Sequence, residues 1–153
     1  MLDKILRTSD DRMLTLLRVA LGVLVFPHGA QKALGWFGGP GFSGTYGFFT
    51  HNLQIPAVLV LLSIAAEFLG SLGLIAGFLG RIAAFGILAN FIVASIMVYK
   101  QGGFYFMNWA GQQKGEGIEF FVLVLVVAIV IVIRGSGAWS VDRALTRGRQ
   151  SSP

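Results

Sequence analysis

Six polar or charged side chains interrupt long apolar stretches of this sequence, where such groups are uncommon. They are Arg18, His28, Lys32, Glu67, Asn90 and Glu119. Side chains of these types can form ion pairs, exchange protons or hydrogen-bond the polar part of an apolar molecule. We therefore take the six as candidate residues for ligand binding or proton exchange. The sequence singles out no catalytic group.

Arg18 and Glu67 are the most informative pair. Arg18 lies about one and a half turns into the first apolar run, and Glu67 lies near the middle of the second. The expected gap between them is roughly 10 Å along the membrane normal, which two long side chains can bridge. Two structural interpretations stay open: an ion pair, or an Arg18 that reaches the near surface beside a protonated Glu67. A functional role is the third, because charges inside a membrane often mark functional sites.

The other polar residues suggest a lining that faces the outside. Arg18, Gly22, Gly29 and Lys32 share one helical stripe, and its glycines allow a close approach of a helix or a ligand. His28, one turn before Lys32, either bonds a backbone carbonyl or contacts a bound polar head group.

The later apolar runs add two members to this lining. For Asn90 we expect a hydrogen bond between helices, since its amide needs a partner. Glu119 is expected near the outer surface, where it is hydrated. If the helices face each other suitably, the lining consists of His28, Lys32, Glu67, Asn90 and Glu119.

The elements that position these residues are four apolar runs. The chain of 153 residues is 55% hydrophobic and 12% charged, against about 25% charged in soluble domains. A membrane span needs roughly 17–25 residues. We therefore expect a single-domain, all-α membrane protein, a four-transmembrane-helix bundle, with helices at about 13–34, 55–79, 82–99 and 116–135. The first run has no clear cleavage site and is interpreted as a retained helix.

The basic residues predict the orientation. With the N-terminus inside, the inner segments hold eight of them and the outer segments three, which fits the positive-inside rule. The protein is then N-in/C-in and multi-pass in the inner (plasma) membrane, with outer loops 35–54 and 100–117 and a cytoplasmic tail 140–153. Basic residues that flank apolar spans indicate topology and lipid contact, so no nucleic-acid partner is expected.

Several motifs are excluded or reinterpreted. Residues 39–44 match G-x-G-x-x-G, but no strand precedes them, so they predict a loop rather than a dinucleotide site. The aromatic residues of the outer loops suit an interfacial belt or, alternatively, a lid over an outward cavity. The absence of cysteine excludes thiolate and iron–sulfur chemistry in this chain, and two histidines predict no metal or haem site.

The two halves share a loose plan without clear sequence similarity. Each has an arginine near the start of its outgoing helix, Arg18 and Arg81, and a glutamate in its return helix, Glu67 and Glu119. We do not infer a repeat from this correspondence alone.

The sequence also resembles the DoxX family over nearly its whole length. The resemblance rests on Arg18, His28-Gly29 and Lys32, on the run from Gly35 to Gly39, and on Glu67. The Gly77–Arg81 turn and the ending Gly135-Ser136-Gly137-Ala138-Trp139-Ser140-Val141-Asp142 also fit. It implies a bacterial four-helix membrane protein. Relatives include a subunit of a thiosulfate:quinone oxidoreductase and a protein that joins superoxide dismutase and a sulfurtransferase in a redox complex.

The leading hypothesis is a membrane subunit that supports quinone-linked redox chemistry or a membrane-associated oxidoreductase complex. An apolar bundle with a few convergent polar groups is typical of a small-molecule pocket. His28 and Glu67 would contact the quinone oxygens, with Arg18 and Lys32 tuning them. One alternative is a non-catalytic scaffold for partner proteins. Another is a carrier for protons or a small solute, for which a homo-oligomer would provide the wider pathway.

Overall fold

The computed structural model describes residues 5–100 and 117–150, and these form helices and connecting segments without a strand. The four long helices are α2 (Arg12–Leu34), α4 (Ala57–Ala76), α5 (Gly80–Lys100) and α6 (Ile118–Arg134). The shorter elements are the 3₁₀ helix η1 (Trp36–Gly38), α3 (Gly41–Gly47), the π-helix η2 (Phe48–Asn52) and α7 (Val141–Gln150).

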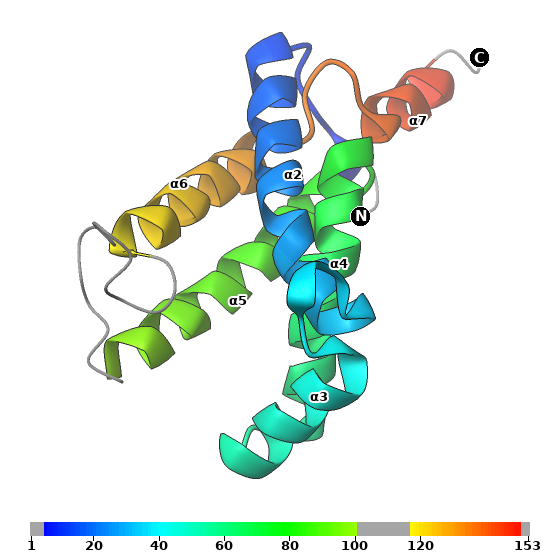
Figure 1. The fold of residues 1–153 in the computed structure, drawn as a ribbon. Helices are drawn as coiled ribbons and strands as arrows, with labels where there is room; N and C mark the ends of the chain where they lie inside the picture. Colours follow the sequence, from blue (N-terminus) through cyan, green and yellow to red (C-terminus); the bar gives the residue numbers. More distant parts are fainter. Residues whose placement is uncertain (1–4, 101–116, 151–153) are drawn as a thin grey trace.

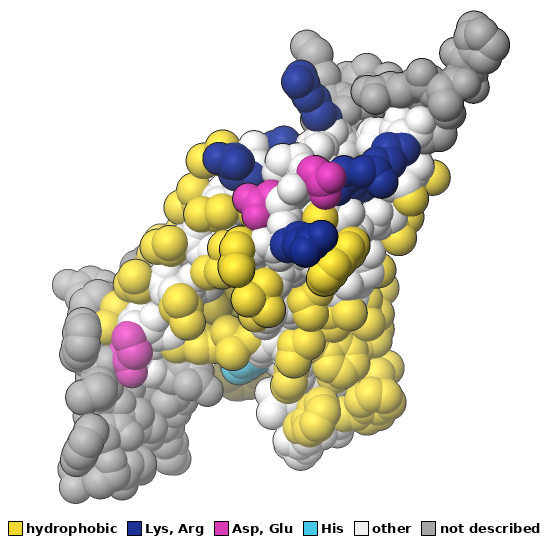
Figure 2. All heavy atoms as spheres, turned by 90° about the horizontal axis from the view of Figure 1, so that it is seen from above, with side chains coloured by type: hydrophobic (Ala, Val, Ile, Leu, Met, Phe, Trp, Pro, Cys, Tyr) yellow, Lys and Arg dark blue, Asp and Glu magenta, His cyan; other side chains and the backbone are white. Residues whose placement is uncertain are grey.

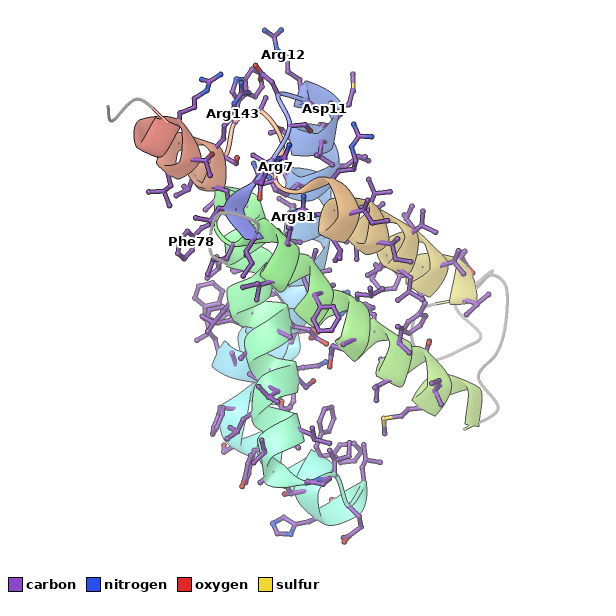
Figure 3. All side chains as sticks on the ribbon, turned by 180° about the vertical axis from the view of Figure 1, so that it is seen from behind. Arg7, Asp11, Arg12, Phe78, Arg81 and Arg143 are labelled. Carbon is purple, nitrogen blue, oxygen red and sulfur yellow. The ribbon has the colours of Figure 1, made fainter. Side chains whose placement is uncertain are left out.

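The long helices form two hairpins. The first hairpin consists of α2 and α4, the second of α5 and α6, and α4 also packs against α5. The hairpins meet at the end of the molecule that carries α7 and diverge toward the end that carries α3 (Figures 1 and 3). A core of apolar side chains joins them, with Leu21, Val25, Ile87 and Val124 among its buried members.

The outer faces of the long helices are apolar. Side chains such as Leu16, Val58, Phe85 and Val122 are more than half exposed, and Figure 2 shows hydrophobic side chains over the flanks of the molecule. Within the described residues, three helices are long and apolar enough to cross a membrane: Arg12–Leu34, Ala57–Ala76 and Gly80–Met97. The chain is therefore a membrane protein whose helices contact lipid.

The helix ends follow from local sequence. Asp11 caps α2, because its carboxylate accepts hydrogen bonds from the backbone N–H groups of Met13 (2.9 Å) and Leu14 (3.2 Å). Gly77 ends α4 with φ of +72°, a conformation that most side chains resist, and it begins the turn into α5. The tight turn expected at Gly77–Arg81 is present.

Two segments differ from the sequence prediction. Residues 35–54 were expected to form a loop, but η1, α3 and η2 make most of this segment helical. The tail 140–153 was expected only to be cytoplasmic, with no helix assigned to it, and it contains α7. In both segments the glycines and polar residues have low helix propensity, so the sequence did not indicate these short helices, which tertiary contacts stabilise. The predicted loop 100–117 lies almost wholly outside the described residues.

Arginines gather where the two hairpins meet. Figure 3 shows Arg7, Arg12, Arg81 and Arg143 together at this end, which we call the basic end. Figure 2 shows the same clustering of Lys and Arg between the apolar flanks. The basic residues of the N-terminal segment, of the start of α5 and of α7 thus share one side of the molecule.

Candidate functional site

Glu67 lies at the junction of three helices. Its side chain is almost fully buried, with 2% of the residue exposed. Lys32 of α2 forms an ion pair with it, with Nζ 2.5 Å from Oε1. Asn90 of α5 donates from Nδ2 to the same oxygen, also at 2.5 Å. We call this group the Lys32–Glu67–Asn90 cluster. The predicted interhelical hydrogen bond of Asn90 is confirmed.

The two oxygens of Glu67 differ. Both donors of the cluster bind Oε1, whereas Oε2 is buried and has no hydrogen-bond partner among the described residues. A buried polar atom without a partner costs about 1–3 kcal/mol and needs an explanation in a native structure. Oε2 is thus an acceptor that fits an added donor such as a hydroxyl group.

A close helix crossing positions Glu67. Gly29 of α2 packs on the backbone of α4, where an added Cβ would lie 2.6 Å from atoms of Glu67 and Phe68. At Gly22, seven residues earlier on the predicted stripe, an added Cβ would likewise lie 2.9 Å from the Ser71 carbonyl oxygen. Because the two helices touch at Gly29, Lys32 one turn later is near enough to reach the carboxylate.

The segment between α2 and α4 covers the lysine. Thr45 of α3 donates a hydrogen bond to the backbone oxygen of Lys32 at 3.3 Å. The Lys32 ammonium also lies 5.8 Å from the ring centre of Phe49 in η2, a cation–π contact. The side chain of Lys32 stays 25% exposed. The α3–η2 segment therefore covers the lysine only in part, and the lysine side of the ion pair remains accessible.

His28 lies next to the cluster among aromatic rings. Its imidazole is 5.4 Å from the Phe120 ring and 6.4 Å from the Phe91 ring, measured between centroids. Phe91 directly follows Asn90, so the imidazole and the cluster are at a similar level of α5. Among the described residues His28 has no hydrogen bond, so the interpretation in which it bonds a backbone carbonyl finds no support there.

Arg18 is not the partner of Glu67, so the ion pair, one of the three interpretations left open by the sequence, is wrong. Arg18 is 1% exposed. Among the described residues its guanidinium donates only to backbone oxygens: to Ser136 at 2.8 Å, to Leu74, to Ile75 at 2.9 Å and to Trp139 at 2.7 Å. The last carbonyl groups of a helix lack N–H donors within the helix and attract cations. The C-terminal end of α4 is at the level of Arg18, whereas Glu67 is about two turns away.

Glu119 lies apart from the cluster. It is exposed in the first turn of α6, and no hydrogen bond or ion pair joins it to the other candidates in the described part of the chain. The predicted lining is thus only partly assembled: three members meet, His28 lies beside them, and Glu119 does not join.

Asp142 is a buried polar residue that the sequence prediction missed. Its carboxylate accepts from the backbone N–H of Leu79 (2.7 Å) and Gly80 (3.0 Å) and from the Ser136 hydroxyl (2.5 Å). It therefore caps the start of α5 from the start of α7. Nothing in a polar tail with several charges distinguishes this aspartate, apart from its place in the family-like ending.

Arg81 repeats the role of Arg18 in the second hairpin. Its guanidinium donates to the backbone oxygens of Val132 and, at 2.7 Å, Ile133 in the last turn of α6. It also donates to the Arg7 oxygen at 3.1 Å and 3.3 Å. The loose plan seen in the sequence thus corresponds to a shared contact, because each arginine binds the end of the return helix of its own hairpin.

Among the comparisons with known proteins, only a family model matches the chain. No curated protein and no solved structure shows significant similarity to the chain. Residues 13–100, more than half of the chain, match the model of the DoxX family. This region contains α2 except its first residue, all of α4 and α5, and the complete Lys32–Glu67–Asn90 cluster. The chain therefore belongs to the DoxX family.

Proposed function

We propose that this protein is a membrane subunit that supports quinone-linked redox chemistry, within an oxidoreductase complex, and that the Lys32–Glu67–Asn90 cluster holds the polar end of a quinone. The observation that carries the proposal is the unpartnered Oε2 of Glu67. A cluster fixed by two donors, with one buried acceptor left over, suits a ligand that supplies the missing hydrogen bond.

The reduced form of a quinone fits this acceptor best. A quinol carries hydroxyl groups that donate hydrogen bonds, whereas the oxidised form offers only carbonyl acceptors. When bound, the group supplies two-electron, two-proton redox chemistry. Lys32 and Asn90 would hold the carboxylate in place, and Oε2 would accept a hydrogen bond from the quinol hydroxyl group. His28, Phe91 and Phe120 offer aromatic surfaces for a ring.

We infer a bacterial plasma-membrane location with four spans and both ends in the cytoplasm. The support is the basic end, where residues from both ends of the described chain and from the α4–α5 connection gather (Figure 3). As the fourth span, α6 has 17 residues, which corresponds to about 26 Å of helix and lies at the short limit for a bilayer. The cluster would then open toward the outer side.

Ligand-dependent thermal unfolding tests the proposed site. Purified protein in mild detergent is melted with and without a short-chain quinol, using wild type and Glu67→Gln. Glu119→Gln is the matched control, because it makes the same chemical change at an exposed glutamate outside the cluster. The quinol should raise the midpoint of wild type and the control equally, by mass action, and should raise that of Glu67→Gln much less. Each shift is measured against the variant's own midpoint.

His28→Phe separates binding from folding. Phenylalanine has nearly the volume of the imidazole, so the packing penalty should stay below about 1.5 kcal/mol, while the quinol-dependent shift should fall. An equal shift in wild type, Glu67→Gln and His28→Phe would refute the quinone site. No shift in wild type would favour a non-catalytic scaffold that assembles partner proteins.

A further inference from the structure

We propose that a cavity at the basic end binds the phosphate group of an anionic lipid. The cavity has a volume of about 330 Å³, and it is lined by Arg7, Thr8, Ser9, Arg81, Ile133 and Arg134. It lies at the start of α5, nine residues before Asn90, and it does not share a residue with the Lys32–Glu67–Asn90 cluster. This inference is therefore independent of the proposed redox function.

Three arginines reach the cavity from three different segments. Arg7 precedes α2, Arg81 is in the first turn of α5, and Arg134 is the last residue of α6. Their convergence is a product of the fold, since these positions are separated by more than 50 residues along the chain. Guanidinium groups are suited to phosphate because their N–H donors match its oxygens in pairs.

These arginines lack a carboxylate partner in the described part of the chain. The acidic residues nearby are engaged elsewhere: Asp10 pairs with Arg143 and Arg147, Asp11 caps α2, and Asp142 caps α5. Arg81 uses much of its guanidinium on backbone oxygens. Like charges that share a cavity repel each other unless an anion lies between them, so the site favours a bound anion.

Ser9 supplies a second and independent observation. Ser9 is one of the lining residues, and its hydroxyl oxygen is buried and has no hydrogen-bond partner among the described residues. A hydroxyl donates one hydrogen bond, and a phosphate oxygen would accept it. The cavity thus combines a positive potential with a donor that no described group satisfies.

The walls favour a lipid over a free anion. Ile133, which lines the cavity, is 64% exposed, and Ile82 beside Arg81 is 51% exposed. These side chains belong to the apolar outer face of the second hairpin, so the cavity opens where a lipid-facing surface meets basic residues. Anionic head groups bind basic clusters at the ends of membrane helices. A phosphate held by the arginines would leave its acyl chains against this apolar face.

Lipid titration of the intact protein in nanodiscs or mixed micelles tests the proposal. Phosphatidylglycerol is added against a phosphatidylcholine background, and binding is followed by native mass spectrometry and thermal unfolding. Arg134→Gln should weaken binding by about fivefold, the effect of removing one basic residue near an anionic surface. The charge-matched control is Arg12→Gln, an exposed arginine at the same end that does not line the cavity. It should weaken binding much less.

Ser9→Ala distinguishes a built site from general attraction, because it changes no charge and should still weaken binding. Equal losses in Arg134→Gln and Arg12→Gln, with none in Ser9→Ala, would overturn the proposal in favour of non-specific surface charge. A separate arm uses inorganic phosphate. If phosphate alone raises the wild-type midpoint, depends on Arg134 and abolishes any effect of the lipid, the cavity is a free-anion site and the lipid assignment is wrong.

Discussion

Arg18 and Glu67 are buried to nearly the same degree, but their polar atoms have very different surroundings. The guanidinium of Arg18 donates to four backbone oxygens that belong to the end of α4 and to the segment after α6. The carboxylate of Glu67 receives two donors on one oxygen and none on the other. The donors of Arg18 are therefore engaged in hydrogen bonds that hold the fold, whereas Glu67 keeps one oxygen, Oε2, without a hydrogen bond.

This difference shows what identifies a site inside a membrane protein. Both residues would be flagged by the same rule, that a charge in an apolar helix suggests function. Their hydrogen bonds distinguish them. A charged group with a structural role has its hydrogen bonds filled within the protein, whereas a binding group keeps an atom free for the ligand. The comparison predicts that Arg18 variants lose stability, and that Glu67 variants lose stability through Lys32 and lose ligand binding through Oε2.

Arg18→Leu should have the largest effect on stability. It removes every donor of the guanidinium and leaves four backbone oxygens without it, at about 1–3 kcal/mol for each buried group that stays unpaired. We expect a loss on the order of 5 kcal/mol, measured by circular dichroism during detergent melts. Arg12→Leu, an exposed arginine of the same helix, should change the midpoint little. Equal midpoints for Arg18→Leu and wild type would remove the distinction between the two charges.

The partner of Glu67 can be identified by double-mutant cycles. Lys32→Met should destabilise the protein by about 3–5 kcal/mol, because it leaves the buried Glu67 without its cation. Glu67→Leu should cost less, because the Lys32 that it leaves behind is partly exposed, and the double variant should recover much of the loss caused by Lys32→Met. The corresponding cycle of Arg18→Leu with Glu67→Leu should be additive, because those residues share no contact. Thermal melts of all variants in one detergent measure both cycles. Coupling to Arg18 in place of Lys32 would contradict the structure.

The part of the fold that depends on local pattern was predictable from the sequence. Long apolar runs gave four helices within a few residues of their positions, and Asp11 is a cap because it directly precedes such a run. Asn90 was correctly expected to bond another helix, since an amide in lipid has few alternatives. Each of these inferences needs only the residue and its neighbours.

The partners of the arginines were not predictable in the same way. Sequence reasoning pairs a charge with an opposite charge, but Arg18 binds backbone oxygens, which every residue carries. The position of Trp139 and Ser136 beside α2 depends on how the two hairpins meet, and so does the burial of Asp142. The contacts of Arg18 with Ser136 and of Leu79 with Asp142 join residues more than 60 positions apart, and no local pattern indicates them.

The smallest effect should come from adding a single methyl group at Gly29. This change tests how closely the α2–α4 crossing positions the Lys32–Glu67–Asn90 cluster. Gly29→Ala would place Cβ 2.6 Å from the backbone of Glu67 and Phe68, so α4 must move away, at about 1–3 kcal/mol for overpacking. Gly70→Ala is the matched control on α4, because its added Cβ meets its nearest neighbours at an ordinary 3.5 Å. It should be neutral or slightly stabilising through helix propensity. The melts should therefore separate two chemically identical changes. Because the shift at Gly29 moves Glu67 relative to Lys32, Gly29→Ala should also reduce the quinol-dependent stabilisation. Equal behaviour of the two variants would mean that the α2–α4 crossing is looser than described and does not position the carboxylate.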